Sequence, residues 1–289
     1  MIDSICISAP CKLNLHLRVL ARRTDGYHDI ESVFQLISLA DELTVSISGD
    51  SPVCSVVSPF MVLPSVNTIT AAVDTFRSAT GIAAGITVQI AKRVPSGAGL
   101  GGGSSDAAAV LKALDRMFCT RLTPALMADM ASRIGSDVPF FLSGRAAVVE
   151  GRGEKISPFL SRSDLFGVLV WPDVHSSTAE GYRLVDAAHA EGRKDPIQWP
   201  HVSDLAAMYR MPVSGWTFGN SFTAPLEAVY PQIKEAKMAL AACGALFYEM
   251  SGSGSTVFGL FEDEKAAETA QIMLSSRWKQ CVKFLLLAS

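Results

Sequence analysis

The sequence predicts an α+β protein built from two domains. Its 289 residues, 49% of them hydrophobic and 18% charged, suffice for one large core or two modest ones, and the length favours two. The first half mixes strand and helix patterns around a glycine-rich segment. The second half has a β-α and then an α-β-β-α-β order, which predicts an antiparallel sheet with helices on one face, a ferredoxin-like layer with insertions.

Strict alternation predicts a strand near the N-terminus. Apolar residues at positions 13, 15, 17 and 19 alternate with Lys12, Asn14, His16 and Arg18. Because successive side chains of a strand point to opposite faces, we expect one buried face, with Lys12 and Asn14 projecting together from the other. A lysine in such a place is often only solvated; the alternative is a fixed cation beside a phosphate.

Periodicity and end signals predict the other elements. Strands are expected at residues 30–39, 43–48, 53–58 and 86–90. Helices are expected at 68–79, between Asn67 as N-cap and Gly81, and at 124–134, between Thr123 as N-cap and Gly135. Around 151–164 the pattern loosens, which suggests a domain boundary. Beyond it we expect strand 166–171, helix 178–190, a poorly patterned segment, helix 233–243, strands 246–250 and 256–261, helix 264–275 and strand 280–287.

Residues 95–109 form a glycine loop that leads directly into a helix expected at 104–118. Five glycines remove Cβ atoms, permit positive φ and let backbone amides approach an anion. The N-terminal amides and the dipole of the helix would face the same anion. This pattern favours a nucleotide phosphate site, although glycine clusters also serve tight turns and close backbone packing.

Two other nucleotide motifs fit this loop less well. A Walker A loop ends in Gly-Lys-Ser/Thr, whereas Gly103 is followed directly by Ser104. Gly-x-Gly-x-x-Gly is satisfied at 97, 99 and 102, but a dinucleotide fold needs an acidic residue about 20 positions on, at the end of a second strand. Asp115 falls inside the expected helix instead. A Rossmann fold is therefore disfavoured.

Charge and cysteine content limit the partners and the compartment. The net charge of −3 and the lack of a basic run disfavour nucleic-acid binding, and no apolar stretch is long enough to span a membrane. Six cysteines without a Cys-x-x-Cys pair favour buried thiols over zinc ligands or disulfides. The first 23 residues do not have the pattern of a signal peptide. We therefore expect a cytoplasmic protein with a small-molecule substrate; the oligomeric state does not follow from the sequence.

Asp137 stands in Gly135-Ser136-Asp137-Val138-Pro139, where one helix is expected to end and another element to begin. It could cap a helix, or it could orient an attacking hydroxyl beside a phosphate. A cation and a carboxylate suit phosphoryl transfer to an alcohol, because alignment and charge stabilisation matter more than base strength in a loose transition state. Lys12 and Asp137 are thus expected to converge beside the terminal phosphoryl group, with Mg²⁺ screening the phosphates.

Two turns have both a plain and a functional interpretation. Asp25-Gly26-Tyr27-His28 is either a surface turn or an aromatic platform with a hydrogen-bonding edge for a nucleobase. Residues 251–255, Ser-Gly-Ser-Gly-Ser, are either a plain hairpin or a backbone that approaches a substrate phosphate.

Together these segments resemble the GHMP kinase superfamily, in the family's order and over most of the chain. The glycine loop and the last motif are typical of the superfamily, and Lys-x-Asn with Asp-Gly-Tyr-His is typical of its bacterial member in non-mevalonate isoprenoid synthesis. The motifs are Ala9 to Leu15, Asp25 to His28, Pro95 to Ala109, Gly135 to Phe141 and Ser251 to Phe261.

The resemblance implies a two-domain GHMP kinase fold, with an N-terminal domain like ribosomal protein S5 domain 2 over 1–161 and a C-terminal ferredoxin-like domain over 162–289. It implies an enzyme that transfers the γ-phosphoryl group of ATP, with Mg²⁺, to the 2-hydroxyl of a cytidine-diphosphate-linked methylerythritol. The implied phosphate loop is Pro95, Ser96, Gly97, Ala98, Gly99, Leu100, Gly101, Gly102, Gly103, Ser104 and Ser105.

The resemblance also assigns roles to single residues. Lys12 and Asp137 would be the catalytic pair, and Asn14 would lie near the transferred phosphate or the polyol. Tyr27 and His28 would hold the cytosine. Tyr182 would be a second aromatic against the base, although a buried helix tyrosine would look the same in the sequence.

Two positions depart from the family pattern. Asn220-Ser221-Phe222-Thr223 stands where relatives usually have Asn-Asp-Phe/Leu-Glu, which leaves no acid there, and Cys11 replaces the usual alanine before Lys12. The alternatives are another GHMP kinase that acts on mevalonate, homoserine or a sugar, and a non-catalytic nucleotide or metabolite sensor. An RNA-binding role is weaker, because the chain lacks a basic patch.

Overall fold

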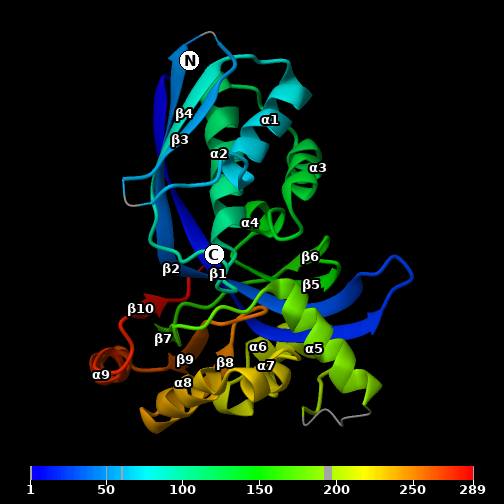
Figure 1. Cartoon of the computed structure of the whole chain (residues 1–289), viewed down its shortest axis with the longest axis vertical. Coiled ribbons are helices and arrows are strands. Elements are labelled where there is room, and N and C mark those ends of the chain that lie inside the picture. Colours follow the sequence, from blue (N-terminus) through cyan, green and yellow to red (C-terminus); the bar gives the residue numbers. More distant parts are fainter. Residues whose placement is uncertain (1, 50, 60, 192–196, 289) are drawn as a thin grey trace. The chain divides into compact units, whose positions relative to one another are not determined.

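The computed structural model describes residues 2–49, 51–59, 61–191 and 197–288 (Figure 1). The chain divides into two compact units. Strands β1 (Ser4–Arg22) and β2 (His28–Gly49) contribute residues to both. Unit 1 comprises Met1–Cys11, Leu39–Ser96 and Gly101–Gly144, and unit 2 comprises Lys12–Ser38, Gly97–Leu100 and Arg145–Ser289.

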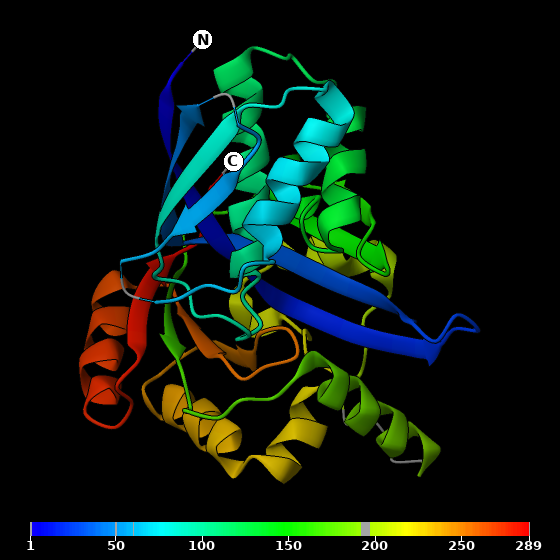
Figure 2. The ribbon, with the colours of Figure 1, turned by 45° about the horizontal axis from the view of Figure 1, so that its top comes forward.

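Unit 1 packs helices against a small sheet, and Figure 2 shows these helices gathered on one side of the strands. Strand β4 (Gly85–Ala91) pairs antiparallel with the Glu42–Gly49 end of β2, and β3 (Cys54–Val57) pairs parallel with β4. The apolar residues of α2 (Gly102–Phe118) are almost fully buried, so this helix is the centre of the core. The helices are α1 (Thr68–Thr80), α2 (Gly102–Phe118), α3 (Pro124–Ile134) and α4 (Phe140–Ser143).

The helix ends in unit 1 confirm the predicted caps. The Asn67 side chain accepts hydrogen bonds from the backbone N–H groups of Ile69 and Thr70, and α1 ends at Gly81 with φ of 73°. Thr123 caps α3 in the same way, through the amide of Leu126. These signals are local, so the sequence alone was enough to find them.

Unit 2 contains a four-stranded antiparallel sheet in the order β10-β7-β9-β8. Numbered along the chain, this order is 4-1-3-2, with helix-containing connections after the first and third strands. Helices α8 (Pro231–Ala242) and α9 (Glu264–Ser275) pack on the sheet through one shared apolar cluster, as the ferredoxin-like prediction requires. The strands are β7 (Phe166–Val170), β8 (Phe247–Met250), β9 (Val257–Phe261) and β10 (Cys281–Leu285).

Unit 2 also contains a second set of paired strands, which includes the first part of β2. Residues Ile30–Gln35 of β2 pair antiparallel with β5 (Ala146–Gly151), and β5 pairs with β6 (Lys155–Pro158). The α-helices are α5 (Thr178–Ala190), α6 (Leu205–Tyr209), α7 (Thr223–Val229), α8 (Pro231–Ala242) and α9 (Glu264–Ser275), and short 3-10 helices lie at Val202–Asp204 and Val213–Gly215.

Two segments differ in detail from the secondary structure that the sequence predicts. The strands expected at 30–39 and 43–48 are one strand, β2. The stretch 151–164, expected to be a boundary, holds the turn of the β5–β6 hairpin, where Gly151 has φ of 69°. The turn residues of a tight hairpin have the same composition as a linker, so the pattern does not separate the two.

Strand β1 also differs from its prediction, because both of its faces are buried in the middle. Lys12, Asn14 and His16 are 3%, 2% and 0% exposed, like the leucines between them. Burial, with a smaller contribution from Arg18, lowers the pKa of His16 to about 3, so this ring is uncharged near neutral pH.

All six cysteines are free thiols, but they are not all buried as expected. Cys11 and Cys281 are buried, whereas Cys6 and Cys119 are exposed. Over the residues described above, no helix has the length and apolar character needed to cross a membrane.

Candidate active site

Lys12 and Asn14 meet on one face of β1, as the alternation predicted. The Lys12 ammonium donates to Asn14 Oδ1 and, at 3.2 Å, to the carbonyl of Gly99, and it lies 4.7 Å from the centroid of the Phe34 ring. Asn14 Nδ2 donates to Ser32 Oγ at 3.1 Å. The ammonium is therefore held in one place by oxygen acceptors and an aromatic face within unit 2.

The glycine loop uses its glycines for two different reasons. Gly97, Gly99 and Gly101 have φ of 68°, 78° and 67°, the left-handed region that favours glycine. Gly102 and Gly103 lie in the first turn of α2 instead, so only three of the five glycines use the positive φ that glycine permits. No amide from Gly97 to Ser104 donates a hydrogen bond inside the described portion of the chain. Such amides are available to an anion.

A second loop, residues 251–255, packs directly on the backbone of Gly99. Ser251 Oγ donates to the Gly99 carbonyl at 2.9 Å and accepts from the Asn14 amide at 3.1 Å. A Cβ at Gly99 would lie 2.0 Å from the Ser251 carbonyl oxygen. Ser251 thus joins the loop, the glycine segment and β1, a contact that the sequence did not reveal.

Asn220 and Thr223, in the segment that departs from the family pattern, support this second loop. Asn220 Nδ2 donates to the carbonyls of Met250 and Gly252, both at 2.8 Å. Thr223 Oγ1 donates to Glu249 at 2.7 Å. Burial raises the pKa of the Glu249 carboxyl, and the Lys237 ammonium 3.5 Å away opposes this shift. The segment therefore acts through buried hydrogen bonds to its neighbours.

His28 and Tyr182, both expected at a nucleobase, come together in unit 2. Their rings are stacked, with centroids 4.9 Å apart and planes 14° apart, and His28 Nε2 lies 2.7 Å from Asp186 Oδ1. Tyr27 does not join this stack: it is 54% exposed, and the Arg152 guanidinium lies 3.7 Å from its ring centroid. Sequence reasoning missed Asp186, which lies one helical turn after Tyr182 on α5.

Asp137 lies in unit 1, half-buried in the turn between α3 and α4. The capping position of α4 is Pro139, with no side-chain hydrogen bond, so Asp137 is not the N-cap that was one of its two interpretations. Its carbonyl accepts from the Phe140 amide at 3.2 Å, and the Val138 amide donates to Gly135 at 3.2 Å. These two hydrogen bonds fix the main chain on both sides of Asp137.

A buried ion cluster in unit 1 was missed by the sequence interpretation. The Lys92 ammonium donates to Asp41 at 2.6 Å and to Asp106 at 2.7 Å, and Asp41 also accepts from the amides of Arg93 and Val94. Burial, and then the second carboxylate, raise the pKa of Asp106 to about 7, against the Lys92 ammonium. The sequence suggested only that Asp106 favours the helix start; its carboxylate instead ties α2 to the segment that precedes the glycine loop.

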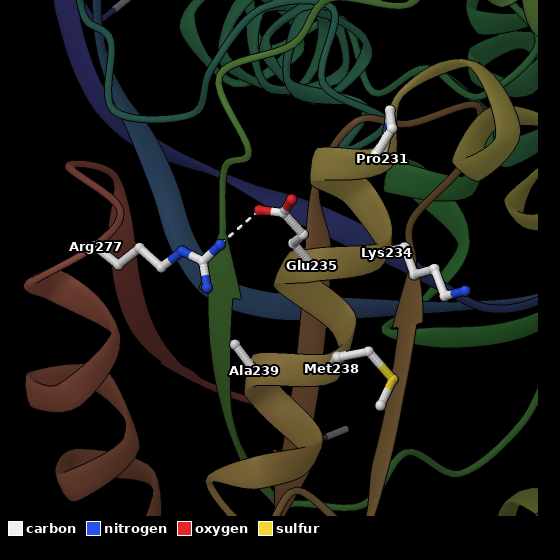
Figure 3. Close-up of a pocket in the computed structure, with 6 residues that line it drawn as sticks. All are labelled: Pro231, Lys234, Glu235, Met238, Ala239 and Arg277. Carbon is white, nitrogen blue, oxygen red and sulfur yellow. Dashed lines mark hydrogen bonds and ion pairs between the residues drawn. The ribbon is translucent and has the colours of Figure 1, made fainter.

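One surface pocket of unit 2 is lined by none of the candidate residues. Its volume is about 430 Å³, and Glu235 and Arg277 form an ion pair of 2.5 Å across it (Figure 3). No group of three or more His, Cys, Asp or Glu side chains able to hold a metal occurs in the parts of the chain that are described. The lining residues are Pro231, Lys234, Glu235, Met238, Ala239 and Arg277.

Comparison with known proteins defines the family. The model of the GHMP kinases N terminal domain matches residues 67–145, and that of the GHMP kinases C terminal matches residues 204–280. The chain belongs to the GHMP kinase family. It has the two-domain α+β fold of that family and is a kinase, and ATP is the substrate that the family implies.

Several of the similar proteins are named as the same kinase. The 4-diphosphocytidyl-2-C-methyl-D-erythritol kinase of Treponema pallidum is 44% identical over 285 residues, covering 97% of this chain and 98% of the relative. That of Alkaliphilus metalliredigens is 36% identical over 95% of this chain and 94% of its own length. A crystal structure of 4-(cytidine 5'-diphospho)-2C-methyl-D-erythritol kinase matches with a TM-score of 0.81 and 32% identity, covering 99% of this chain and all of that one.

A more distant structural match shows the fold alone. The homoserine kinase of Cytophaga hutchinsonii has a TM-score of 0.74 at 18% identity, covering all of this chain and 96% of that one.

Proposed function

We propose that this chain phosphorylates the 2-hydroxyl of 4-diphosphocytidyl-2-C-methyl-D-erythritol with ATP, in isoprenoid biosynthesis. The observation that carries the chemistry is the contact of the buried Lys12 ammonium with Asn14 and with the carbonyl of Gly99 in the glycine loop. The named acceptor is supported by relatives of that name that match nearly the whole chain.

The catalytic groups in this proposal are Lys12 and Asp137. Lys12 would neutralise charge that develops on the transferred phosphoryl group, which a fixed donor does best because it needs no reorganisation. Asp137 would orient the acceptor hydroxyl and take its proton late, when the phosphoryl transfer is well advanced. Asn14 accepts from Lys12 and would contact the transferred phosphate or the polyol.

Pro95 to Ser105 would hold the phosphates of ATP, supported by the amides from Gly97 to Ser104 that have no acceptor within the described residues. Mg²⁺ usually binds substrate phosphates with one or two protein oxygens. Ser104 fits this role, because it lies in the first turn of α2, half-buried, and its hydroxyl makes no hydrogen bond to a described residue. The bound ion would screen the negative charge of the phosphates.

His28, Tyr182 and Tyr27 would form the cytosine subsite. If the His28 ring is neutral and donates its Nε2 proton to Asp186, Nδ1 is left as an acceptor. Such an acceptor suits the exocyclic amino group of cytosine. Tyr182 presents a flat ring beside it, and the exposed Tyr27 would provide a second apolar surface.

We also propose domains at 1–161 and 162–289 and a cytoplasmic location. The two family matches fall on either side of residue 161, and six cysteines, none of them in a disulfide, suit a reducing compartment. A small-molecule substrate without nucleic-acid or membrane partners agrees with the net charge of −3.

The test is ATP consumption with the cytidine-linked methylerythritol, with mevalonate, homoserine and galactose as competing acceptors. We expect turnover with the first alone, inhibition by cytidine nucleotide, and loss of turnover on the order of 10²–10⁴-fold in Asp137→Asn. Preference for another acceptor would move the chain elsewhere within the GHMP kinases, and ATP binding without turnover on any alcohol would indicate a sensor.

A further inference from the structure

A third loop of unit 2, residues 173–177 after β7, reaches the glycine segment. It is tied to the 251–255 loop from both sides: Ser176 Oγ donates to the Ser253 carbonyl at 3.0 Å, and Ser255 Oγ donates to the Val174 carbonyl at 2.5 Å. A Cβ at Gly254 would lie 3.2 Å from Ser176 Oγ, so the two loops also pack closely. The backbone on both sides of His175 is therefore fixed.

The His175 ring lies directly on Gly97. A Cβ at Gly97 would stand 3.2 Å from Cε1 and 3.8 Å from Nδ1 of the imidazole. Gly97 has φ of 68°, so its backbone is turned as in the anion-binding conformations of glycine loops. The absence of a side chain at Gly97 thus brings an imidazole next to a peptide group that is expected to face phosphate.

The imidazole of His175 differs from those of His16, His28 and His201 in its hydrogen bonding. His16 accepts from the Gly219 amide, His28 pairs with Asp186, and His201 contacts Ser203. His175 is exposed, and its ring nitrogens make no hydrogen bond with any residue that the structure describes. An imidazole with an available N–H, held over a glycine loop, has the chemistry to donate to a phosphate oxygen.

We propose that His175 is a further substrate-contact residue that donates a hydrogen bond to a phosphate oxygen of a substrate held at Gly97. The proposal rests on the proposed function, in which both substrates carry phosphates: ATP, and the acceptor through its cytidine diphosphate group. Both sources offer the same chemistry, and the experiment separates them.

The experiment compares His175→Ala and His175→Gln with wild type in steady-state assays that vary ATP and the cytidine-linked acceptor separately. A hydrogen bond to a charged oxygen predicts a KM about 10-fold higher for one of the two in His175→Ala, with kcat changed less. The amide of His175→Gln should restore part of the loss. A rise for ATP assigns the contact to the nucleotide, and a rise for the acceptor assigns it to the diphosphate.

The control is His189→Ala, because His189 is an exposed histidine in the last turn of α5 and has no place in the site. It should leave both KM values unchanged. Calorimetric titration of each variant with ADP and with CDP reports binding without turnover. Unchanged KM values together with unchanged ADP and CDP affinities in His175→Ala would overturn the inference. A wild-type enzyme that binds both nucleotides but does not phosphorylate this acceptor would overturn the proposed function instead.

Discussion

Each of the two units holds a lysine that is shielded from solvent, fully for Lys12 and partly for Lys92, and the two lysines are held in different ways. Lys92 in unit 1 lies between two carboxylates, those of Asp41 and Asp106, at 2.6 and 2.7 Å. The contacts of Lys12 within unit 2 include the uncharged oxygens of Asn14 and Gly99 and the Phe34 ring. An ammonium that two carboxylates enclose is suited to join segments of the fold. An ammonium that contacts neutral oxygens is suited to stabilise negative charge on a substrate.

The largest expected effect is on folding, from Lys92→Met. The change leaves two buried carboxylates without their cation, which typically costs about 3–5 kcal/mol in the free energy of unfolding. Urea unfolding measures it. Lys283 is the matched control, because it also contacts two carboxylates, Glu264 and Glu268, but on the surface, so Lys283→Met should change the unfolding midpoint little. Equal losses of stability in the two variants would contradict the structural role assigned to Lys92.

Lys12→Met should act mainly on catalysis. Loss of a fixed donor to the transition state predicts a fall in kcat on the order of 10²–10³-fold. The loss of stability should be smaller than for Lys92→Met, because Asn14 and Gly99, which lose the ammonium in unit 2, present neutral oxygens and not two buried carboxylates. Measuring kcat and the melting temperature on one preparation tests both points. A variant that unfolds as readily as Lys92→Met while the remaining folded enzyme keeps its kcat would contradict this assignment.

Asp106→Asn should have the smallest effect of the three substitutions. It tests the Lys92 cluster through the pH dependence of the free energy of unfolding. The raised pKa of Asp106, about 7, means that the folded protein keeps a proton that the unfolded chain releases near pH 4. This contribution to stability is complete below pH 4 and is lost as pH rises through 7, with a slope of at most about 1.4 kcal/mol per pH unit. Asparagine does not titrate, so unfolding curves of the variant between pH 5 and 8 should lack this slope. If the free energy of unfolding depends on pH in the same way in wild type and variant, Asp106 does not have the raised pKa described above.

Local signals made most of the fold predictable. Caps such as Asn67 and Thr123, and the glycine at 81, act within a few residues of their helices, so their sequence context is complete. The four strands of the second sheet were found because their apolar runs lie between clear helices. The hairpin of β5 and β6 was missed because its turn has the glycine and charge content of a linker.

The site was predictable only where a motif keeps its parts close in the sequence. Lys12 and Asn14 lie two positions apart on one strand, so their shared face followed from alternation. Asp186 is 158 positions from His28, and Lys92 is 51 from Asp41, so those pairs depend on the tertiary fold. Burial of the polar face of β1 was missed for the same reason, because the residues that cover it come from distant segments.

The glycines of the loop at residues 95–105 differ in what would happen if each gained a methyl group. At position 99 the methyl group would collide with main-chain atoms of Ser251, and at 102 with the Val94 side chain 2.8 Å away. At 103 the backbone is helical and the nearest atom is the Thr68 hydroxyl at 3.2 Å. A larger residue at 99 would therefore displace the backbone of Ser251, whereas alanine or serine at 103 would require only a small shift of the Thr68 side chain.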